Sequence, residues 1–409
     1  MFKHLNTGQA FGLSLALLAL MPTPLAAGER HPGPCFPRPR PRHQTRASKA
    51  PTRFVLSNRT AGPRGKEPVF VTLTAMDELG RFVRMDDRGR FLPCDPADNT
   101  VRIGDQDWAP YAIPLAKVRS FQVERGRLLR GARLYLSVGA PLWLRVDPVT
   151  GGLVQPDMNN PEDPNASTVF DWMEFALDGS GFHGNTTCVD QFGLPITLEV
   201  VEASGAKAGP VGIARRRSDI LAAYRDAMPS AFAALADAGG LRILAPGHAT
   251  QGPLTTYLDG YIRAMWERYR SEPLVLTPDE GTFTGRVDGQ GRLVFTREGD
   301  ACTYVIPRMP TTREAWRCDG PLTEGNATER VLGALLGALI NRHTLEAPLS
   351  WRDEEADYDA SPANSYAAFW HAEGIGGKAY GFAYDDVNDR STLVNAADPL
   401  EVRVAFRID

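Results

Sequence analysis

The sequence lacks the features that mark several common classes of protein. Its 45 basic and 49 acidic residues give a net charge of −4, whereas nucleic-acid-binding proteins usually carry a basic excess on one face. It contains no GxSxG, HExxH or glycine-rich phosphate-binding pattern, which argues against the usual serine hydrolases, zinc peptidases and nucleotide-binding proteins. We therefore expect no nucleic-acid partner, no metal and no cofactor.

Paired CxxC spacing, which marks zinc sites, is also missing. The five cysteines are Cys35, Cys94, Cys188, Cys302 and Cys318. An odd number leaves at least one of them outside any intramolecular disulfide. The spacing favours a bond between Cys302 and Cys318, because closing a loop of that size would remove about 3 kcal/mol of denatured-state entropy. Buried free thiols that act as small hydrophobic groups are the alternative.

Only the beginning of the chain has a long apolar run. Lys3 precedes an apolar segment at 11–21, and the small residues Ala26 and Ala27 follow it. This order predicts a signal peptide over residues 1–27 and hence a secreted, extracellular protein. An uncleaved anchor is the alternative, but the run is short for a bilayer span. No later segment is long and apolar enough to cross a membrane, so no membrane association is expected after cleavage.

The rest of the chain changes character three times. Residues 28–53 are rich in proline and arginine, as in an extended linker. Short β-branched and aromatic runs predict a mainly β domain over 54–205. Residues 206–370 mix strands with helices predicted at 213–238, 254–270 and 328–345, the first interrupted by Pro229. Segments 378–386 and 400–408 are predicted as strands, and we expect 371–409 to return to the β domain.

The predicted hairpin DWMEFALDGSGFHGNTTCVD, over 171–190, places two carboxylates among apolar residues. Alternation puts Trp172 and Glu174 on one strand face and Met173 and Phe175 on the other. A carboxylate in apolar surroundings must be paired, hydrogen-bonded or protonated. The hairpin is therefore a candidate catalytic site, although acidic pairs on strands are also common on solvated surfaces.

The expected pairing of the two hairpin strands predicts the distance between the two carboxylates. A return strand that starts near Asn185 would place Cys188 opposite Glu174 and make Asp190 a diagonal neighbour, roughly 7 to 8 Å away. Carboxyl groups roughly 6.5 to 9.5 Å apart leave room for a water molecule and suit inverting glycoside hydrolysis. Glu174, beside Trp172, is then the expected acid, and Asp190 the expected base.

Several blocks carry a wider resemblance. In chain order they are GARLYLSVGAPLWLRV, LVQPDMNNPEDPN, the hairpin, QFGLPITLEV and SYAAFWHAEGIGGKAYGFAYDDVNDRSTLV. From about Phe54 to the C-terminus the sequence resembles glycoside hydrolase family 64, the laminaripentaose-producing β-1,3-glucanases related to thaumatin-like proteins. The resemblance implies an α+β fold, in which a thaumatin-like β-barrel or sandwich domain packs against a mixed α/β domain with a wide groove between them.

The resemblance also implies roles for individual residues. Glu174 matches the family's general acid and Asp190 its general base, with inversion at the anomeric carbon. The expected substrate-binding residues are Trp172, Asp178, His183, Asn185, Thr187, His371, Tyr384, Asp385 and Asp386. Departures from the family at Ala176, Asp178 and His183 put the affinity of the sugar subsites and the product length in question.

Trp172, Trp351 and Trp370 are candidates for stacking on sugar rings, with core packing as the alternative for each. Trp266, on the apolar face of a predicted helix, is expected in the core.

The sequence thus predicts a secreted endo-type β-1,3-glucan hydrolase that acts as a monomer on laminarin, curdlan or cell-wall glucan and releases short oligosaccharides, laminaripentaose above all. Two alternatives remain: a thaumatin-like protein that binds β-1,3-glucan without cutting it, and a structural adhesin whose carboxylates are only surface groups.

Overall fold

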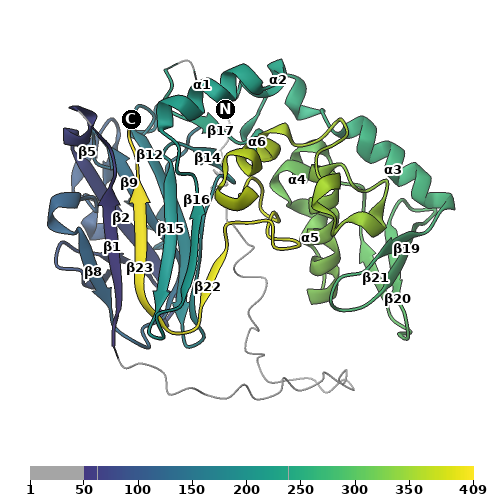
Figure 1. Ribbon diagram of the computed structural model, residues 1–409, viewed down its shortest axis with the longest axis horizontal. Coiled ribbons are helices and arrows are strands. Elements are labelled where there is room, and N and C mark those ends of the chain that lie inside the picture. Colours follow the sequence, from purple (N-terminus) through teal and green to yellow (C-terminus); the bar gives the residue numbers. More distant parts are fainter. Residues whose placement is uncertain (1–49, 62, 238) are drawn as a thin grey trace, which may run out of the picture.

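The computed structural model describes residues 50–409, except 62 and 238 (Figure 1). The predicted signal peptide over 1–27 and most of the predicted linker over 28–53 lie outside these residues. Among the described helices, none combines the length and the apolar composition needed to cross a bilayer. The fold is a mixture of α-helices and several β-sheets, which confirms the predicted α+β class at that level. The predicted domain boundaries stay predictions.

A five-stranded sheet brings the two ends of the described chain together. Its strands, in spatial order, are β16 (Lys207–Gly212), β15 (Ile196–Glu202), β23 (Pro399–Phe406), β1 (Thr52–Asn58) and β8 (Ser120–Val123). The yellow β23 lies between β1 and β15 in Figure 1, parallel to β1 and antiparallel to β15. The strand predicted at 400–408 is thus confirmed, and it occupies the centre of the sheet.

An eight-stranded sheet carries the hairpin with the two acids. Its strands are β22 (Val394–Ala396), β13 (Gly181–Thr186), β12 (Val169–Asp178), β9 (Leu129–Val138), β2 (Val69–Met76), β3 (Phe82–Met85) and β4 (Phe91–Pro93), and β7 (Ile113–Pro114) pairs with β2. The alternation predicted for β12 places Met173 and Phe175 toward the other sheet, but the opposite face of the strand, with Phe170 and Trp172, is buried as well.

The two sheets pack face to face around one hydrophobic core. Phe54 of β1 and Val402 of β23 lie in the same buried cluster as Leu134 of β9 and Met173 and Phe175 of β12. The rings of Phe54 and Phe175 have centroids 5.1 Å apart, so the sheets are in direct contact. This packing fixes the opposite face of β12, which carries Trp172 and Glu174.

A second, larger core lies among the helices and the four-stranded sheet on the right of Figure 1. The sheet consists of β18 (Leu274–Leu276), β19 (Phe283–Val287), β20 (Leu293–Arg297) and β21 (Thr303–Ile306). The helices are α1 (Arg217–Ala227), α2 (Ser230–Ala233), α3 (Asp259–Ser271), α4 (Thr312–Arg317), α5 (Ala327–Arg342) and α6 (Ser365–Glu373). The predicted break at Pro229 separates α1 from α2, and Asn326 caps α5 by accepting from the amides of Thr328 and Glu329.

Three short strand pairs complete the structure: β5 (Val101–Ile103) with β6 (Gln106–Trp108), β10 (Arg145–Val146) with β11 (Leu153–Val154), and β14 (Gln191–Phe192) with β17 (Ile243–Leu244). The last pair matters for the candidate site, because β14 directly follows Asp190 and β17 leads into the short 3-10 helix η5 (Pro246–His248).

The strand predicted over 378–386 is wrong, because this segment folds back on itself. The amide of Asp385 donates to the carbonyl of Phe382, and the amide of Gly381 donates to the Asp385 carboxylate at 2.9 Å. A side chain that accepts a hydrogen bond from a nearby backbone amide competes with extended pairing. The apolar alternation of this segment therefore reflects burial of a compact loop.

The predicted bond between Cys302 and Cys318 is also wrong. Four cysteines, Cys94, Cys188, Cys302 and Cys318, are free thiols in the part of the chain that the structure describes, and Cys35 lies outside it. Cys302 is exposed just before β21, whereas Cys318 is buried where α4 ends. Buried Cys188 and Cys318 fit the alternative of thiols that act as small hydrophobic groups, and burial raises the pKa of both.

Candidate active site

The face of β12 opposite the sandwich core holds Glu174. Met173 and Phe175 enter the core between the sheets, whereas Trp172 joins a smaller apolar cluster with Tyr135 and Phe170 on the other face. Only 6% of Glu174 is exposed. A carboxylate this enclosed needs charged or hydrogen-bonding partners to offset the lost hydration.

Glu174 has two such partners, both at the oxygen Oε1. Arg133, directly opposite on β9, donates from Nε at 3.0 Å, and the indole Nε1 of Trp172 donates at 3.2 Å. The Arg133 guanidinium also lies 5.3 Å from the centre of the Trp172 ring, a cation–π contact. The carboxyl group is therefore fixed in orientation through Oε1.

Asp190 lies beyond the hairpin, between β13 and β14, with its side chain about one-fifth exposed. Its carbonyl accepts from the amide of Ala245 at 2.9 Å, and its Oδ1 lies 3.2 Å from Nε2 of His248 on η5. Burial alone would raise the pKa of Asp190, but the hydrogen bond and charge of His248, followed by Arg133 and Arg317, hold that pKa below its usual range. Asp190 is thus kept ionised, as a general base requires.

Asp171, on the core-facing side of β12, anchors the chain after Asp190. Its Oδ2 accepts from the amides of Gly193 and Leu194 at 2.7 and 3.0 Å. Burial raises the pKa of Asp171 to about 7, although these hydrogen bonds lower it. Asp171 therefore ties the segment that carries Asp190 to the strand that carries Glu174.

The charges of Glu174 and Asp190 both shift the pKa values of two side chains on β9, Arg133 and Tyr135. Burial would lower the pKa of Arg133, but the nearby Tyr135, Glu174 and Asp190 raise it above its ordinary value. The pKa of Tyr135 is raised by burial, and Glu174 and Asp190 add to the rise while Arg133 opposes it. The structure thus gathers the two predicted catalytic acids around Arg133 and Tyr135, where one group can donate a proton while another accepts one.

The predicted hairpin register is wrong in detail. Gly179 and Ser180 alone form the turn, since Asp178 already pairs with Gly181, and Glu174 therefore faces Asn185 rather than a residue near Cys188. The Asp178 carboxylate closes this turn by accepting from the amide of Ser180 at 2.7 Å. Asp190 approaches Glu174 through the loop beyond β13, so the separation expected from strand pairing does not follow.

Comparison with known proteins identifies the family. The sequence model of glycoside hydrolase family 64, described as beta-1,3-glucanase, matches residues 51–406. The chain belongs to this family. The glucan endo-1,3-beta-glucosidase of Cellulosimicrobium cellulans is 29% identical over 283 residues, 65% of this chain and 50% of that protein. The family 64 chain thus spans about half the length of the curated relative it matches.

Solved structures support the same assignment. A family 64 β-1,3-glucanase domain from Clostridium beijerinckii matches with a TM-score of 0.82 and 29% identity, over 89% of this chain and 100% of that one. The laminaripentaose-producing β-1,3-glucanase from Paenibacillus barengoltzii, complexed with laminarihexaose, matches with a TM-score of 0.68 and 26% identity, over 88% and 76%. The fold of this chain is therefore that of family 64.

Three of the predicted substrate-binding residues of this family 64 chain lie close to Glu174 along the chain or across the hairpin. Trp172 bonds to Glu174, and Asn185 faces it across the hairpin. Asn185 is buried, and its Oδ1 has no hydrogen-bond partner among the described residues. Thr187 is buried as well, and its hydroxyl accepts from the amide of Val189 at 3.1 Å, which shapes the approach to Asp190.

Asp178 and His183 lie at the tip of the hairpin. Ser180 and its neighbours hold the Asp178 pKa below its usual range against the effect of burial. His183 lies 2.6 Å from Asn395 Oδ1 of β22 and 2.8 Å from the Ser180 hydroxyl. These contacts stabilise the turn and its edge strand.

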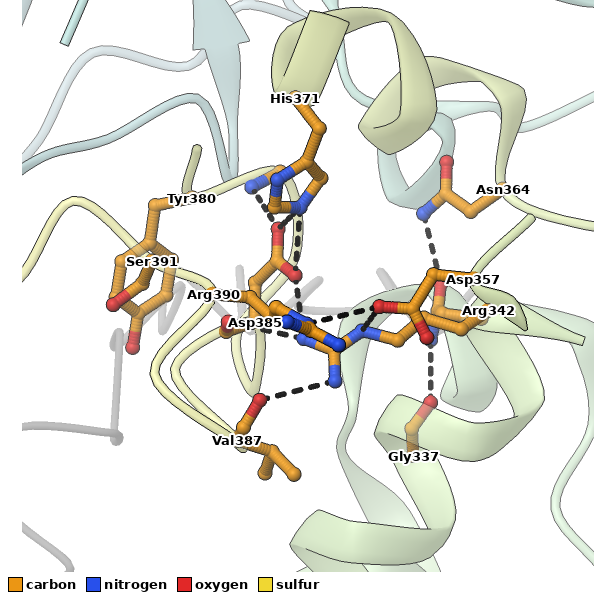
Figure 2. A network of polar contacts seen from close by, with 12 residues as sticks. Gly337, Arg342, Asp357, Asn364, His371, Tyr380, Asp385, Val387, Arg390 and Ser391 are labelled. Carbon is orange, nitrogen blue, oxygen red and sulfur yellow. Dashed lines mark hydrogen bonds and ion pairs between the residues drawn. The ribbon is translucent and has the colours of Figure 1, made fainter. Parts of the chain in front are cut away.

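The four predicted residues near the end of the chain belong to or flank a buried polar network, shown in Figure 2. Asp385 is fully buried, with Arg342 at 2.9 Å and His371 Nε2 at 3.0 Å from its carboxylate oxygens. Tyr384 is buried beside Cys318, and burial, followed by the charge of Asp385, raises the pKa of Asp386 to about 6. The carboxylate of Asp385 has no exposed surface with which to meet a ligand.

The other three tryptophans considered in the sequence, Trp266, Trp351 and Trp370, lie in the core. Trp370 is completely buried against Phe192 and Tyr224, and Trp351 is buried with its indole donating to Thr277. Trp266 is buried on α3, as predicted. Core packing, the alternative for Trp351 and Trp370, is thus what the structure describes.

Sequence reasoning missed Arg133, Tyr135, His248 and Asn159. The strand prediction for GARLYLSV contained a signal for Arg133, because a charged residue on a mostly buried strand needs a partner. His248 and Asn159 come from loops without periodicity, and no pattern linked them to Asp190. Among the described residues, no group of three or more histidine, cysteine, aspartate or glutamate side chains is arranged to hold a metal ion.

Proposed function

We propose that this chain is an endo-type β-1,3-glucanase that cleaves its substrate with inversion and releases short laminari-oligosaccharides, laminaripentaose among them. The proposal rests on one observation above all: two buried or partly buried carboxylates, Glu174 and Asp190, are held by different partners, the first by Arg133 and Trp172 and the second by His248. Glu174 is enclosed and oriented by two donors, whereas Asp190 is held ionised by His248.

The proposed reaction assigns one step to each acid. Glu174 donates its proton to the glycosidic oxygen as the bond from that oxygen to the anomeric carbon breaks. Asp190 accepts a proton from a water molecule as the water oxygen bonds to the same carbon from the opposite face. Because the base remains an anion until it accepts this proton, the low pKa of Asp190 favours its role at neutral pH.

The substrate assignment draws on the relatives. A family 64 neighbour was solved with laminarihexaose, and the curated relative is a glucan endo-1,3-beta-glucosidase. We propose that a β-1,3-glucan chain passes Glu174 and Asp190 in a groove between the β sandwich and the helical part, and that the protein acts as a monomer. Contributions from β9, β12 and η5 to one cluster support this arrangement.

The test uses purified protein with laminarin and curdlan, with products separated by chromatography and their anomers followed by early-time NMR. We expect α-anomeric oligosaccharides first. Glu174→Gln and Asp190→Asn should each lose nearly all turnover while still binding curdlan. The matched controls Glu267→Gln and Asp279→Asn change exposed acids and should retain full activity.

The runner-up function is binding of β-1,3-glucan without cleavage. Curdlan binding by the wild type without any released product would favour it over the glucanase. A protein that neither binds nor cleaves curdlan would favour the adhesin.

Secretion through residues 1–27 is a separate proposal, carried by the sequence alone. Expression of the full chain in a secreting bacterial host, followed by determination of the mature N-terminus, tests it. Cleavage after Ala27 is the expected result, and an intact N-terminus would contradict it.

A further inference from the structure

The backbone around His248 holds this residue against Asp190. β14 begins directly after Asp190 and pairs with β17, where Gln191 faces Leu244 and Phe192 faces Ile243. The amide of Ala245, just after β17, donates to the Asp190 carbonyl, and η5 then places His248 Nε2 3.2 Å from Asp190 Oδ1. The two residues are therefore joined by both backbone and side-chain contacts, although they are far apart in sequence.

Asn159 determines which ring nitrogen of His248 carries the hydrogen. The Nδ2 atom of Asn159, a donor, lies 3.3 Å from Nδ1 of His248. A ring nitrogen that accepts a hydrogen bond has no hydrogen of its own, so the neutral ring carries its hydrogen on Nε2. The Nε2 atom then donates to Asp190 Oδ1.

The charged groups around Asp190 come from three elements. Besides His248 on η5, they are Arg133 on β9 and Arg317 on α4, and the neutral but titratable Tyr135 on β9 lies near them. Arg133 is bonded to Glu174, and Arg317 donates to Asp319 at 2.9 Å. The Asp190 carboxylate is bonded to His248 at 3.2 Å.

We propose that His248, oriented by Asn159, is the positioning residue of the general base: its Nε2–H holds Oδ1 of Asp190, so that Oδ2 accepts the proton of the attacking water. This rests on the proposed glucanase function. In that step an O–H bond of the water breaks, the proton moves to Oδ2, and the water oxygen forms its bond to the anomeric carbon while Glu174 protonates the leaving oxygen. His248 loses and gains no proton.

The pH dependence of activity separates this role from a merely structural one. Asp190 must be ionised, so it sets the acidic limb of the profile of kcat/KM against pH. His248→Ala removes the hydrogen bond that favours the charged form, and we expect the limb to move to higher pH by roughly one unit. We also expect kcat to fall about 10-fold. His248→Gln retains an N–H donor and should restore most of both.

A matched control removes another histidine paired with a carboxylate. His343 lies 3.3 Å from Glu346 where α5 ends, and its backbone is left-handed with φ of 58°. His343→Asn suits this backbone, because asparagine adopts the left-handed region readily. In the profile of kcat/KM against pH, we expect the acidic limb of the His343→Asn variant to coincide with that of the wild type.

The tautomer of His248 gives a test that does not depend on the folding of a variant. NMR of the ring nitrogens in the wild type, at a pH where the ring of His248 is neutral, should show hydrogen on Nε2 and none on Nδ1. A neutral ring with its hydrogen on Nδ1 overturns the proposal, and so does a His248→Ala enzyme that folds and keeps the wild-type limb. If the wild type does not cleave any glucan, the proposed glucanase function is wrong. If the wild type cleaves glucan but His248→Ala leaves the acidic limb unchanged, only the proposed role of His248 is wrong.

Discussion

The indole Nε1 of Trp172 donates a hydrogen bond to Oε1 of Glu174, two residues along the same strand, at 3.2 Å. Successive residues on one face of a strand are close enough for this contact. Trp172 thereby orients the proposed acid together with Arg133. Predicted as a sugar-stacking residue, it is buried in the structure, with its ring between Tyr135 and Phe170.

Trp172→Phe tests this orienting role. The change keeps an aromatic ring but removes the N–H donor, a loss of about 1 kcal/mol, or a factor of about 5 in kcat. Trp266→Phe is the matched control, because it also removes an indole donor, to the carbonyl of Gly291, outside the candidate site. Steady-state kinetics on laminarin would contradict the role if both variants kept the wild-type kcat.

The turn of the catalytic hairpin offers a second prediction. Gly181 has φ of 126°, and a Cβ there would lie 2.1 Å from the carbonyl oxygen of Ala396 in β22. Gly181→Ala should lower the free energy of unfolding by more than about 2 kcal/mol, because both strain and a backbone clash result. A Cβ at Gly179 meets no atom within 4 Å, so Gly179→Ala should be nearly neutral. Urea denaturation of the two variants decides, and equal stabilities would refute the argument.

The buried pair of Arg342 and Asp385 supports a third prediction. Their closest atoms are 2.9 Å apart, and both side chains are almost completely buried. Asp385→Ala should destabilise the protein by about 3 kcal/mol, because a buried guanidinium loses a charged partner. Asp389→Asn removes the charge of an exposed partner of Lys378 and suits the left-handed backbone there, with φ of 56°, so it should change stability by less than about 0.5 kcal/mol. Thermal unfolding of both variants measures the difference, and a mild effect of Asp385→Ala would contradict it.

The pair of His371 and Asp385 predicts a pH dependence. Burial would lower the pKa of His371, but Asp385 raises it above the usual 6.5; the pKa of Asp385 lies below the usual 3.8, mainly through His371 and Arg342 and against burial. The contribution of His371 to stability is complete below pH 6.5 and is lost as the pH rises through its folded value. The contribution of Asp385 is complete above pH 3.8 and is lost in acid.

His371→Gln isolates the contribution of the histidine charge to stability. The difference in Tm between the wild type and this variant should be largest near pH 5.5 and should shrink as the pH rises, since the wild-type histidine loses its charge as the pH passes its raised folded pKa. When both proteins also carry Asp385→Ala, the difference in Tm between them should no longer depend on pH. A difference that stays constant from pH 5.5 to 9 would show that His371 acts without its charge.

Periodicity explains which parts of the fold could be predicted. The alternation at 168–177 and the helical period at 254–270 and 328–345 correctly predicted a strand and two helices, which the structure describes as β12, α3 and α5. The loop at 378–386 has the same apolar composition, but its conformation depends on the contact of Asp385 with Arg342, more than forty positions earlier. Such contacts leave no local period.

The candidate site, like the fold, could be predicted only in part from the sequence. Glu174 and Asp190 stood out because two carboxylates interrupt the apolar residues of one predicted hairpin, and the resemblance pointed to the same pair. The prediction of register failed because it depended on where the chain turns: Asp178 and Ser180 close the hairpin at once, four residues before the return strand was expected. His248 and Asn159 could not be found, since nothing in their own neighbourhood refers to Asp190.

The central place of β23 bears on how the protein is made. Residues 52–58 leave the ribosome early, but their parallel neighbour at 399–406 is synthesised more than three hundred residues later. Until then β1 and β15 have no partner between them, and two unpaired edges are open to other chains. We expect the nascent sandwich to depend on chaperones during translation, and removal of the last ten residues to leave it unable to close.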